Sequence, residues 1–114
     1  IIEGMAGVQQ FVTIGKHAFV AGGSMVRKNV PPYIKAAREP LSYIGVNSIG
    51  LRRRGYDNDR ILIIEDIYRM LYVQNGNITQ ALRAAESELP ASEDKNIILD
   101  FIHASDKGII RGPF

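Results

Sequence analysis

The sequence predicts the last coils of a parallel β-helix followed by a domain of α-helices. β-Branched aliphatic residues recur every six residues, at Ile2, Val8, Ile14, Val20 and Val26. Four residues after each of them comes a small or β-branched side chain: Ala6, Val12, Ala18, Ser24 and Val30. A six-residue period fits neither an α-helix nor a hairpin strand and is typical of hexapeptide coils. After residue 47 the spacing of apolar residues becomes helical.

The repeat ends at two consecutive prolines, Pro31 and Pro32. Proline has no amide donor, so we expect strand pairing to stop there. Residues 34–46 have no clean period, and we expect an extended connector with a short turn. The predicted domains are therefore hexapeptide coils over 1–33, a connector over 34–46 and a helical domain over 47–114.

Four residues of the types that cap helices predict where the helices begin: Asn47, Asp57, Asn77 and Ser92. Asn47 precedes a short helix over 48–54 that Gly55 closes, and Asp57 begins a longer one that Gly76 ends. Aliphatic residues at helical spacing give each of the three later helices one buried face. We expect the tail, residues 107–114, to be irregular.

Composition excludes several classes of site. The chain has 114 residues, 46% of them hydrophobic, which is enough for one packed core. It has no cysteine, and its two histidines, His17 and His103, are far apart, so we expect neither a metal site nor a disulfide. No apolar run is long enough for a membrane span, and no secretory signal is evident. The net charge of +2 is too small to indicate nucleic acid.

The hexapeptide repeat is too short to cover a core by itself. Five hexads make fewer than two triangular coils, whereas repeat proteins need about three or more stacked units. We therefore expect this chain to be the C-terminal piece of a longer protein.

Several blocks occur together in one order: Gly-Met-Ala-x-Val-x-Gln-Phe over 4–11, Ile-Gly-x-His over 14–17, Val-Pro-Pro-Tyr over 30–33, Gly-Val-Asn over 45–47, Gly-Leu-Arg-Arg-Arg-Gly over 50–55 and Gly-Ile-Ile-Arg over 108–111. This set resembles the C-terminal portion of the UDP-N-acetylglucosamine acyltransferase family of lipid A biosynthesis. The resemblance runs from residue 1 to about Arg111. The hexads alone would indicate only a hexapeptide acyltransferase, whereas the later blocks are more specific.

The resemblance implies a left-handed parallel β-helix with a helical C-terminal domain, an exception to the usual right-handed crossover rule. It implies a cytoplasmic homotrimer with active sites between neighbouring β-helices and no cofactor. The implied reaction moves a 3-hydroxyacyl group from acyl carrier protein onto the 3-hydroxyl of UDP-N-acetylglucosamine. The family's catalytic histidine, a general base, lies upstream of this sequence, so no catalytic residue is expected here.

Two glutamines match the family's substrate cleft. The resemblance implies that Gln10 binds substrate, and Gln9 stands where the family usually has histidine. A glutamine amide can form a hydrogen bond but cannot carry a proton, so an acid–base role at Gln9 is in doubt. Without the resemblance, both residues are simply outward-facing polar side chains on a coil.

Two further positions match the family's acyl-chain groove. His17 is expected either to contact the acyl chain or its carrier or to be a polar residue on the coil surface. Gly22 lies where, in the family, a side chain limits how deep the acyl tail runs. Because glycine leaves that space open, we expect tolerance for a long acyl chain, although a tight corner would also require glycine.

The clearest charge cluster is Arg52, Arg53 and Arg54. Arginines bind phosphate in a bidentate manner and attract acidic partners, whereas a helix end alone would account for some of this charge. The resemblance implies that Arg53 and Arg54 bind substrate and that all three contact acyl carrier protein. Asn47 is expected near the nucleotide, or only as a helix cap. Ile49 departs from the acidic residue common in the family.

Two other functions remain open, and a third is disfavoured. One is a hexapeptide acyltransferase with a different acceptor, which the departures at Gln9 and Ile49 leave possible. A second is a non-catalytic module for trimerisation or carrier binding. Nucleic-acid binding is disfavoured, because the basic residues form one cluster without interleaved aromatic residues.

Overall fold

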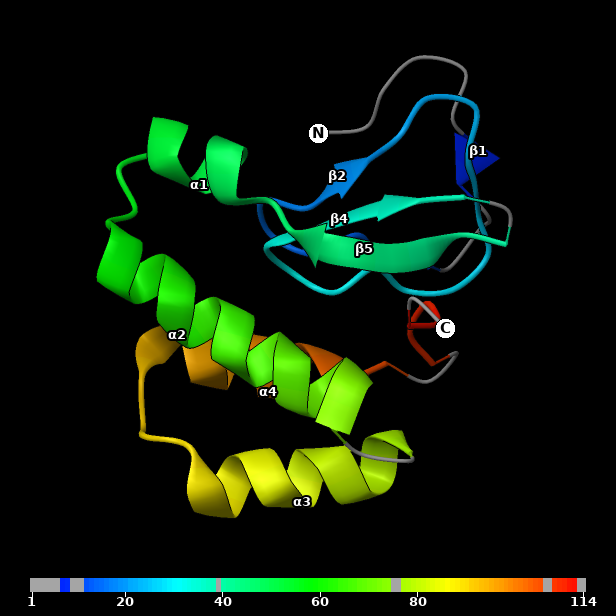
Figure 1. Ribbon diagram of the computed structural model, residues 1–114. Coiled ribbons are helices and arrows are strands. Elements are labelled where there is room, and N and C mark those ends of the chain that lie inside the picture. The colour runs from blue at the N-terminus through cyan, green and yellow to red at the C-terminus, as the bar shows by residue number, and fades with distance from the viewer. Residues whose placement is uncertain (1–6, 9–11, 39, 75–76, 106–107, 113–114) are drawn as a thin grey trace.

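The structure, a computed structural model, describes residues 7–8, 12–38, 40–74, 77–105 and 108–112 (Figure 1). The strands are β1 (Gly7–Val8), β2 (Phe19–Val20), β3 (Met25–Val26), β4 (Ile34–Ala37) and β5 (Ser42–Val46). The helices are α1 (Ser48–Arg53), α2 (Asn58–Arg69), α3 (Ile78–Glu88) and α4 (Glu93–His103), with a π-helical segment, η1 (Met70–Gln74), continuing α2.

The first strands stack in parallel, as the six-residue period predicts. β1 pairs with β3 so that Gly7 lies opposite Met25, 18 residues or three hexads later. β2 pairs with β4 in the same direction, and Ile14 forms a parallel bridge with Val30. Five residues at the predicted inward and corner positions are buried, and two more, Val12 and Ile14, are partly buried. The buried ones are Ala18, Val20, Ser24, Val26 and Val30. The positions of Ile2 and Ala6 lie outside the described residues.

Gly15 lets one coil pass close to the next. Its amide donates to the carbonyl of Val30 at 2.7 Å, and a Cβ at this position would lie 2.4 Å from the amide nitrogen of Pro32. Only glycine fits this approach without displacing backbone. Strand pairing continues beyond the two prolines, since β4 pairs in parallel with β2, so the expectation that it stops there was wrong.

Residues 34–46, expected as an extended connector with a short turn, form two strands that the sequence did not predict. β4 and β5 form an antiparallel pair that joins β2 in a three-stranded mixed sheet. The register shifts between Lys35 and Ala36, and Gly45 lies opposite this irregularity at a φ of 143°. The bulge and the short strands hide the two-residue alternation that would have indicated strands.

The predicted helix starts are confirmed. Asn47, Asp57, Asn77 and Ser92 each accept a hydrogen bond from the amide three residues later. Gly55 has a φ of 90° after the first helix, as a closing glycine should. Gly76 lies outside the described residues, and the π-helical end of the second helix was not predicted.

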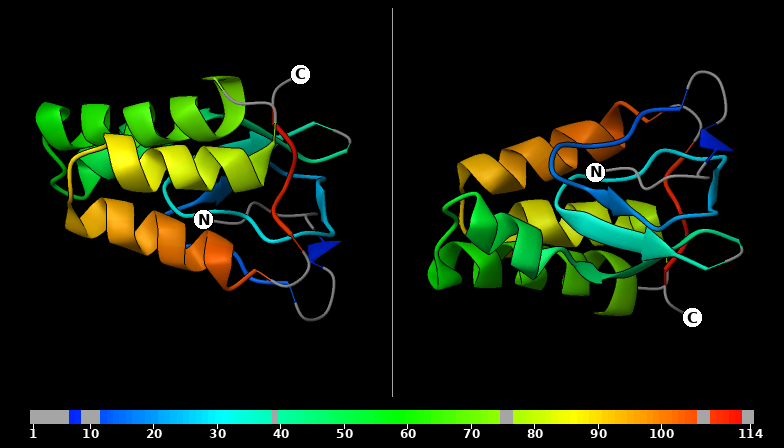
Figure 2. Two further views of the ribbon diagram at one scale, coloured as in Figure 1. Left: turned by 90° about the horizontal axis from the view of Figure 1, so that it is seen from below. Right: turned by 90° about the horizontal axis from the view of Figure 1, so that it is seen from above.

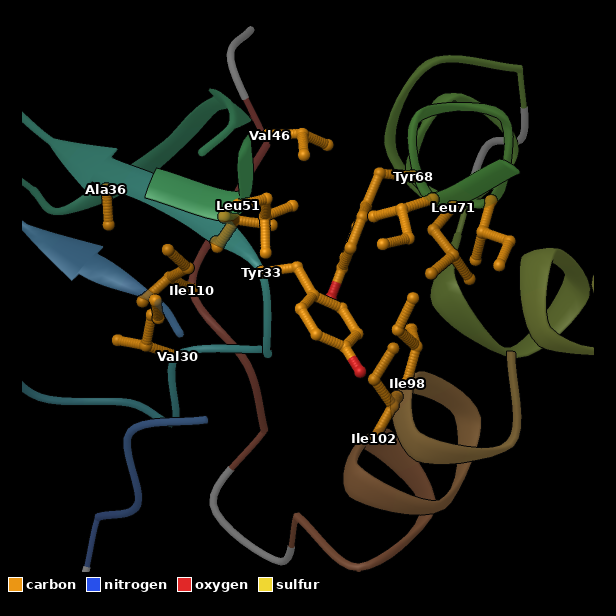
Figure 3. Packing of buried hydrophobic residues seen from close by; sticks show 14 of the residues in the cluster. Val30, Tyr33, Ala36, Val46, Leu51, Tyr68, Leu71, Ile98, Ile102 and Ile110 are labelled. Atoms are coloured by element: carbon orange, nitrogen blue, oxygen red, sulfur yellow. The ribbon is translucent and has the colours of Figure 1, made fainter. Parts of the chain in front are cut away.

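Helices α2, α3 and α4 lie on one side of the strands (Figure 1). In Figures 1 and 2, α2 and α4 lie side by side against the sheet, and α3 lies farther from it. Figure 3 shows Tyr33 and Tyr68 pointing into the space between the sheet and Ile98 and Ile102 of α4. The core therefore lies mainly between the strands and these two helices.

The tail is more regular than expected. Ile109 and Arg111 form parallel bridges with Asn29 and Ser42, and the amide of Tyr43 donates to the carbonyl of Arg111 at 2.8 Å. The tail thus returns to the strands (Figure 1). Among the described residues, no helix combines the length and apolarity needed to cross a membrane.

Candidate functional site

His17 lies in a turn before β2, at the junction of the coils and the helices. Its φ of 57° places it in the left-handed region. Its ring centroid lies 5.8 Å from that of Tyr56, edge to face, and 6.3 Å from that of Tyr33. We call His17, Tyr33, Asn47, Arg54 and Tyr56 the His17 corner, because the contacts described below connect them.

Asn47 ties the first helix to the coil. Its side-chain Oδ1 accepts from the amide of Gly50 at 3.3 Å, and its Nδ2 donates to the carbonyl of His17 at 3.2 Å. Its own amide donates to the carbonyl of Tyr33 at 2.8 Å. A Cβ on Gly50 would lie 2.5 Å from the side-chain Nδ2 of Asn47, so glycine is needed for this cap. The capping role of Asn47 is confirmed, and contact with a nucleotide stays a prediction.

The arginines occupy the exposed end of α1. All three side chains are exposed. Arg52 Nε donates to Asn58 Oδ1 at 3.2 Å, and Arg54 Nη1 lies 3.4 Å from the carbonyl of Gly50. These solvent-exposed contacts leave the guanidinium groups accessible to a phosphate or a carboxylate.

The surroundings of His17 favour its neutral form. Burial lowers the pKa of this imidazole below its usual value of 6.5, and the positive charges of Arg54 and Lys16 lower it further. At pH 7 the ring is therefore neutral, and one of its nitrogens can accept a hydrogen bond. Among the neighbouring charges, that of Arg54 contributes most to this lowering.

A buried charge network supports the corner and was missed by the sequence reading. Asp94 of α4 accepts from Arg60 Nε at 2.7 Å, from Arg60 Nη2 at 3.1 Å and from the Tyr33 hydroxyl at 2.8 Å. The Arg60 guanidinium also stacks over the Tyr56 ring, 4.0 Å from its centroid. Asp94 was not singled out in the sequence, because its partner Tyr33 lies 61 residues earlier in the chain.

Asp94 is held ionised by its donors. Burial raises the pKa of this carboxyl, but the hydrogen bonds from Arg60 and Tyr33 outweigh burial and bring it below the ordinary value of 3.8. Burial also raises the pKa of Tyr33, and the hydrogen bond to Asp94 raises it further. The network therefore consists of a carboxylate, a guanidinium and a neutral phenol.

Of the other predicted site residues, Gly22 lies away from the His17 corner. Gly22 is exposed in the turn between β2 and β3, beside Gly23 at a φ of 78°. Gln9 and Gln10 lie outside the described residues. The structure thus brings together His17, Asn47 and Arg54 and does not add Gly22 to them.

Two grooves lie away from the His17 corner. One, of about 520 Å³, is lined by Met25, Arg27, Lys28, Pro40, Leu41, Ile110 and Arg111. The other, of about 420 Å³, lies between η1 and the tail. Within the described part of the chain, no three histidine or carboxylate side chains are grouped as metal ligands would be.

Comparisons with known proteins identify similar chains. A family profile described as "Udp N-acetylglucosamine O-acyltransferase; Domain 2" matches residues 29–110. The chain is 40% identical over 112 residues to the acyl-[acyl-carrier-protein]–UDP-N-acetylglucosamine O-acyltransferase of Xanthomonas oryzae pv. oryzae. It is 33% identical over 111 residues to the protein of the same name from Myxococcus xanthus. Each match covers 97% of this chain and 43% of the relative.

Solved structures agree with these matches. The UDP-N-acetylglucosamine acyltransferase of Bacteroides fragilis superposes with a TM-score of 0.93 at 44% identity, covering 96% of this chain and 43% of that one. The corresponding protein of Acinetobacter baumannii gives a TM-score of 0.88 at 28% identity over the same shares. The chain thus spans less than half the length of the curated and solved relatives described here.

Proposed function

This chain belongs to the UDP-N-acetylglucosamine O-acyltransferase family, and we propose that it works within an enzyme that acylates UDP-N-acetylglucosamine. The proposed donor is a 3-hydroxyacyl group on acyl carrier protein, and the proposed acceptor is the 3-hydroxyl of the glucosamine, as in the first step of lipid A biosynthesis. The observation that carries the proposal is the family match over 29–110, which includes the exposed arginines and Asn47 of the His17 corner.

The reaction forms an ester and breaks a thioester. A general base takes the proton of the sugar hydroxyl, the oxygen attacks the thioester carbonyl, and the carrier's thiol leaves with a proton. We place the base, a histidine, in the part of the relatives' length that this chain does not span. His17 is not proposed as that base, since the neighbouring cations Arg54 and Lys16 disfavour the imidazolium that a base forms.

The arginines would bind the anionic groups of the two substrates. UDP-N-acetylglucosamine carries a diphosphate, and Arg53 and Arg54 present exposed guanidinium groups beside the His17 corner. We assign these two residues to substrate binding and all three arginines to the acidic carrier protein. Gln10, Gln9 and Asn47 are proposed as further substrate contacts.

The acyl chain would pass near Gly22 and His17. Gly22 is exposed in its turn, so no side chain of its own blocks a groove there. We therefore propose that the enzyme accepts a long acyl donor. Acceptance of short donors only by the full-length enzyme would contradict this.

The parallel pairing at an 18-residue interval supports a finer architecture. We propose that residues 1–33 are the last coils of a left-handed β-helix, that 34–46 connect them to a helical domain over 47–114, and that the enzyme is a cytoplasmic homotrimer. Sedimentation of the full-length product tests the trimer, since a monomer would leave the proposed clefts between subunits unformed.

The test is acyl transfer read by mass spectrometry. This chain and the full-length gene product that contains it are each mixed with UDP-N-acetylglucosamine and a 3-hydroxyacyl carrier protein. We expect the acylated nucleotide sugar from the full-length product only. Product from the 114-residue chain alone would contradict the placement of the base outside it, and no product from either would contradict the proposed reaction.

One observation favours a second acceptor. Ile49 is 61% exposed in the first turn of α1, beside Asn47 and at a position where the family often has an acidic residue. An apolar side chain there cannot hydrogen-bond a uridine or a sugar hydroxyl. A panel of nucleotide sugars in the same assay tests this, and a preference for another sugar would support the altered acceptor.

A further inference from the structure

Backbone strain is concentrated in the His17 corner. Among the described non-glycine residues, only His17, Tyr33 and Arg38 have positive φ, at 57°, 72° and 77°. The first two have their rings in contact, and the amide of Tyr33 donates to the carbonyl of Lys16 at 2.8 Å. Left-handed conformations of large side chains persist only where the surroundings enforce them, and they cluster at functional sites.

Tyr33 is fixed at both ends. Its hydroxyl donates to the buried Asp94 at 2.8 Å. Its amide donates to the carbonyl of Lys16, next to His17, and its carbonyl accepts from the amide of Asn47, at the start of α1. Asn47 in turn donates to the carbonyl of His17. One residue therefore connects helix α4 to the loop of His17 and to the start of α1.

Several hydrogen bonds hold the first turn of α4, which contains Asp94, in place. Asp94 has Arg60 as a bidentate partner, and the neighbouring Lys95 donates through Nζ to the carbonyls of Glu86 and Leu89 at 3.2 and 2.9 Å. A lysine ammonium at the end of α3 is favoured by the helix dipole. The first turn of α4 is thus tied to α2 through Arg60 and to α3 through Lys95.

We propose that Asp94 and Tyr33 are positioning residues that hold His17, Asn47 and Arg54 in one arrangement for the anionic nucleotide sugar. We call these two residues the Asp94–Tyr33 clamp. The identity of the substrate in this inference rests on the proposed function. The role of the clamp rests on the contacts of Asp94 and Tyr33 alone. Neither residue touches the reacting atoms. The clamp acts because the coil, α1 and α4 meet at the strained backbone of Tyr33.

The decisive variant is Tyr33→Phe in the full-length gene product. It removes one hydroxyl, changes no charge and leaves Arg60 paired with Asp94 through two hydrogen bonds. We expect KM for UDP-N-acetylglucosamine to rise about tenfold with kcat nearly unchanged, well below the ~10²-fold that a 1 Å misplacement can cost. Asp94→Asn keeps an oxygen acceptor for Tyr33 but breaks the ion pair, and it is expected to raise KM in the same way.

The second readout does not depend on activity. Deuterium exchange at the histidine C2 position, followed over pH by mass spectrometry, reports the pKa of His17. Burial and the charges of Lys16, Arg54 and Arg60 lower this pKa in the intact corner. Since Tyr33→Phe alters none of those charges, a loosened and better hydrated corner should raise the pKa toward 6.5.

The matched control is Asp66→Asn. Asp66 likewise pairs with an arginine, Arg69, at 2.7 Å, but both residues belong to α2 and both side chains are about half exposed. We expect this variant to change neither KM nor the pKa of His17. Tyr33→Phe with an unchanged KM and an unchanged His17 pKa would overturn the clamp. If the unmodified product makes no acylated sugar, the proposed function fails, and the pKa of His17 alone then decides for or against the clamp.

Discussion

Two groups of tyrosines join the strands to the helices, and they do so differently. Tyr43, Tyr68 and Tyr72 stack nearly in parallel, with Tyr43 and Tyr72 only 4.6 Å apart at 13°. Tyr33 and Tyr56 meet at 61°, with centroids 5.9 Å apart. The first group is a flat stack between β5 and the end of α2, whereas the second lies beside His17 and the exposed arginines.

The acceptors of their hydroxyls explain the difference. In the stack, Tyr68 donates to the carbonyl of Pro32 at 2.5 Å and Tyr72 to that of Ile110 at 2.9 Å. In the corner, Tyr33 donates to the carboxylate of Asp94. Neutral backbone acceptors serve packing, while a buried charge makes the second contact depend on protonation and on Arg60. Tyrosine thus contributes mainly to packing in the stack and to a charge-assisted hydrogen bond in the His17 corner.

Truncating the stack should have the largest effect on stability. Tyr68 is fully buried between the sheet and α4, so Tyr68→Ala should lower the free energy of unfolding by about 4 kcal/mol, in the range seen for large aromatic truncations. Tyr68→Phe keeps the ring and loses one hydrogen bond, for about 1 kcal/mol. Chemical denaturation of both variants measures the gap. Equal losses would mean that the hydroxyl, not the ring, holds the stack.

Breaking the ion pair between Asp94 and Arg60 should destabilise the protein less, and the loss of stability should depend on pH. Asp94→Asn should lower the free energy of unfolding at pH 7 by about 3 kcal/mol, at the low end for a buried ion pair because the Arg60 side chain is 40% exposed. The pKa of Asp94 is lowered in the folded protein, so its stabilisation is present above 3.8 and is lost as pH falls through the folded value. Denaturation at pH 7 and at about pH 3 measures the difference between the two proteins.

The stack supplies the control for this dependence. Tyr68 and its acceptor are uncharged at both pH values, so the loss in Tyr68→Phe should be the same at pH 3 and pH 7. If Asp94→Asn loses as much stability in acid as at pH 7, the carboxylate stabilises the protein through packing and not through its charge.

Much of the fold could be predicted from local pattern. The hexads placed Val20 and Val26 inward and Ala18 and Val30 near the corners, and all four are buried. The four capping residues identified the helix starts. Each of these signals is contained in a few adjacent residues, so one sequence suffices to see it. The arginine cluster was visible for the same reason.

The missed features depend either on a local irregularity or on partners distant in the chain. The strand pair over 34–46 is interrupted by a bulge, and the tail gains its order only from Asn29 and Ser42, far upstream. The Asp94 network joins three elements whose residues look ordinary one by one. Asp94 resembles a helix-start acid, and Tyr33 resembles a packing tyrosine. Only their meeting in space gives them a role.

The helix caps Asn77 and Asn47 differ in the same way, since one only caps its helix and the other also contacts His17. Asn77 is exposed and accepts from the amide of Gln80 at 2.9 Å, while Asn47 is buried and also donates to His17. Asn77→Ala should cost about 1 kcal/mol, the usual value for a cap, and Asn47→Ala about 2 kcal/mol because a buried carbonyl also loses its donor. Thermal unfolding of the pair measures this. Equal losses would mean that the bond to His17 carries no stability.

The smallest effect on stability is expected where the effect on function is greatest. Arg54 is exposed and its contact to the carbonyl of Gly50 is long, so Arg54→Ala should change the free energy of unfolding by less than about 0.5 kcal/mol. Removing its positive charge should raise the pKa of His17 and, in the full-length product, raise KM for the nucleotide or the carrier. Steady-state kinetics and histidine exchange measure both. Arg69→Ala, an exposed arginine of α2 paired with Asp66, is the control that should change neither. A normal KM in Arg54→Ala would move phosphate binding away from α1, even if the stability and the pKa behave as expected.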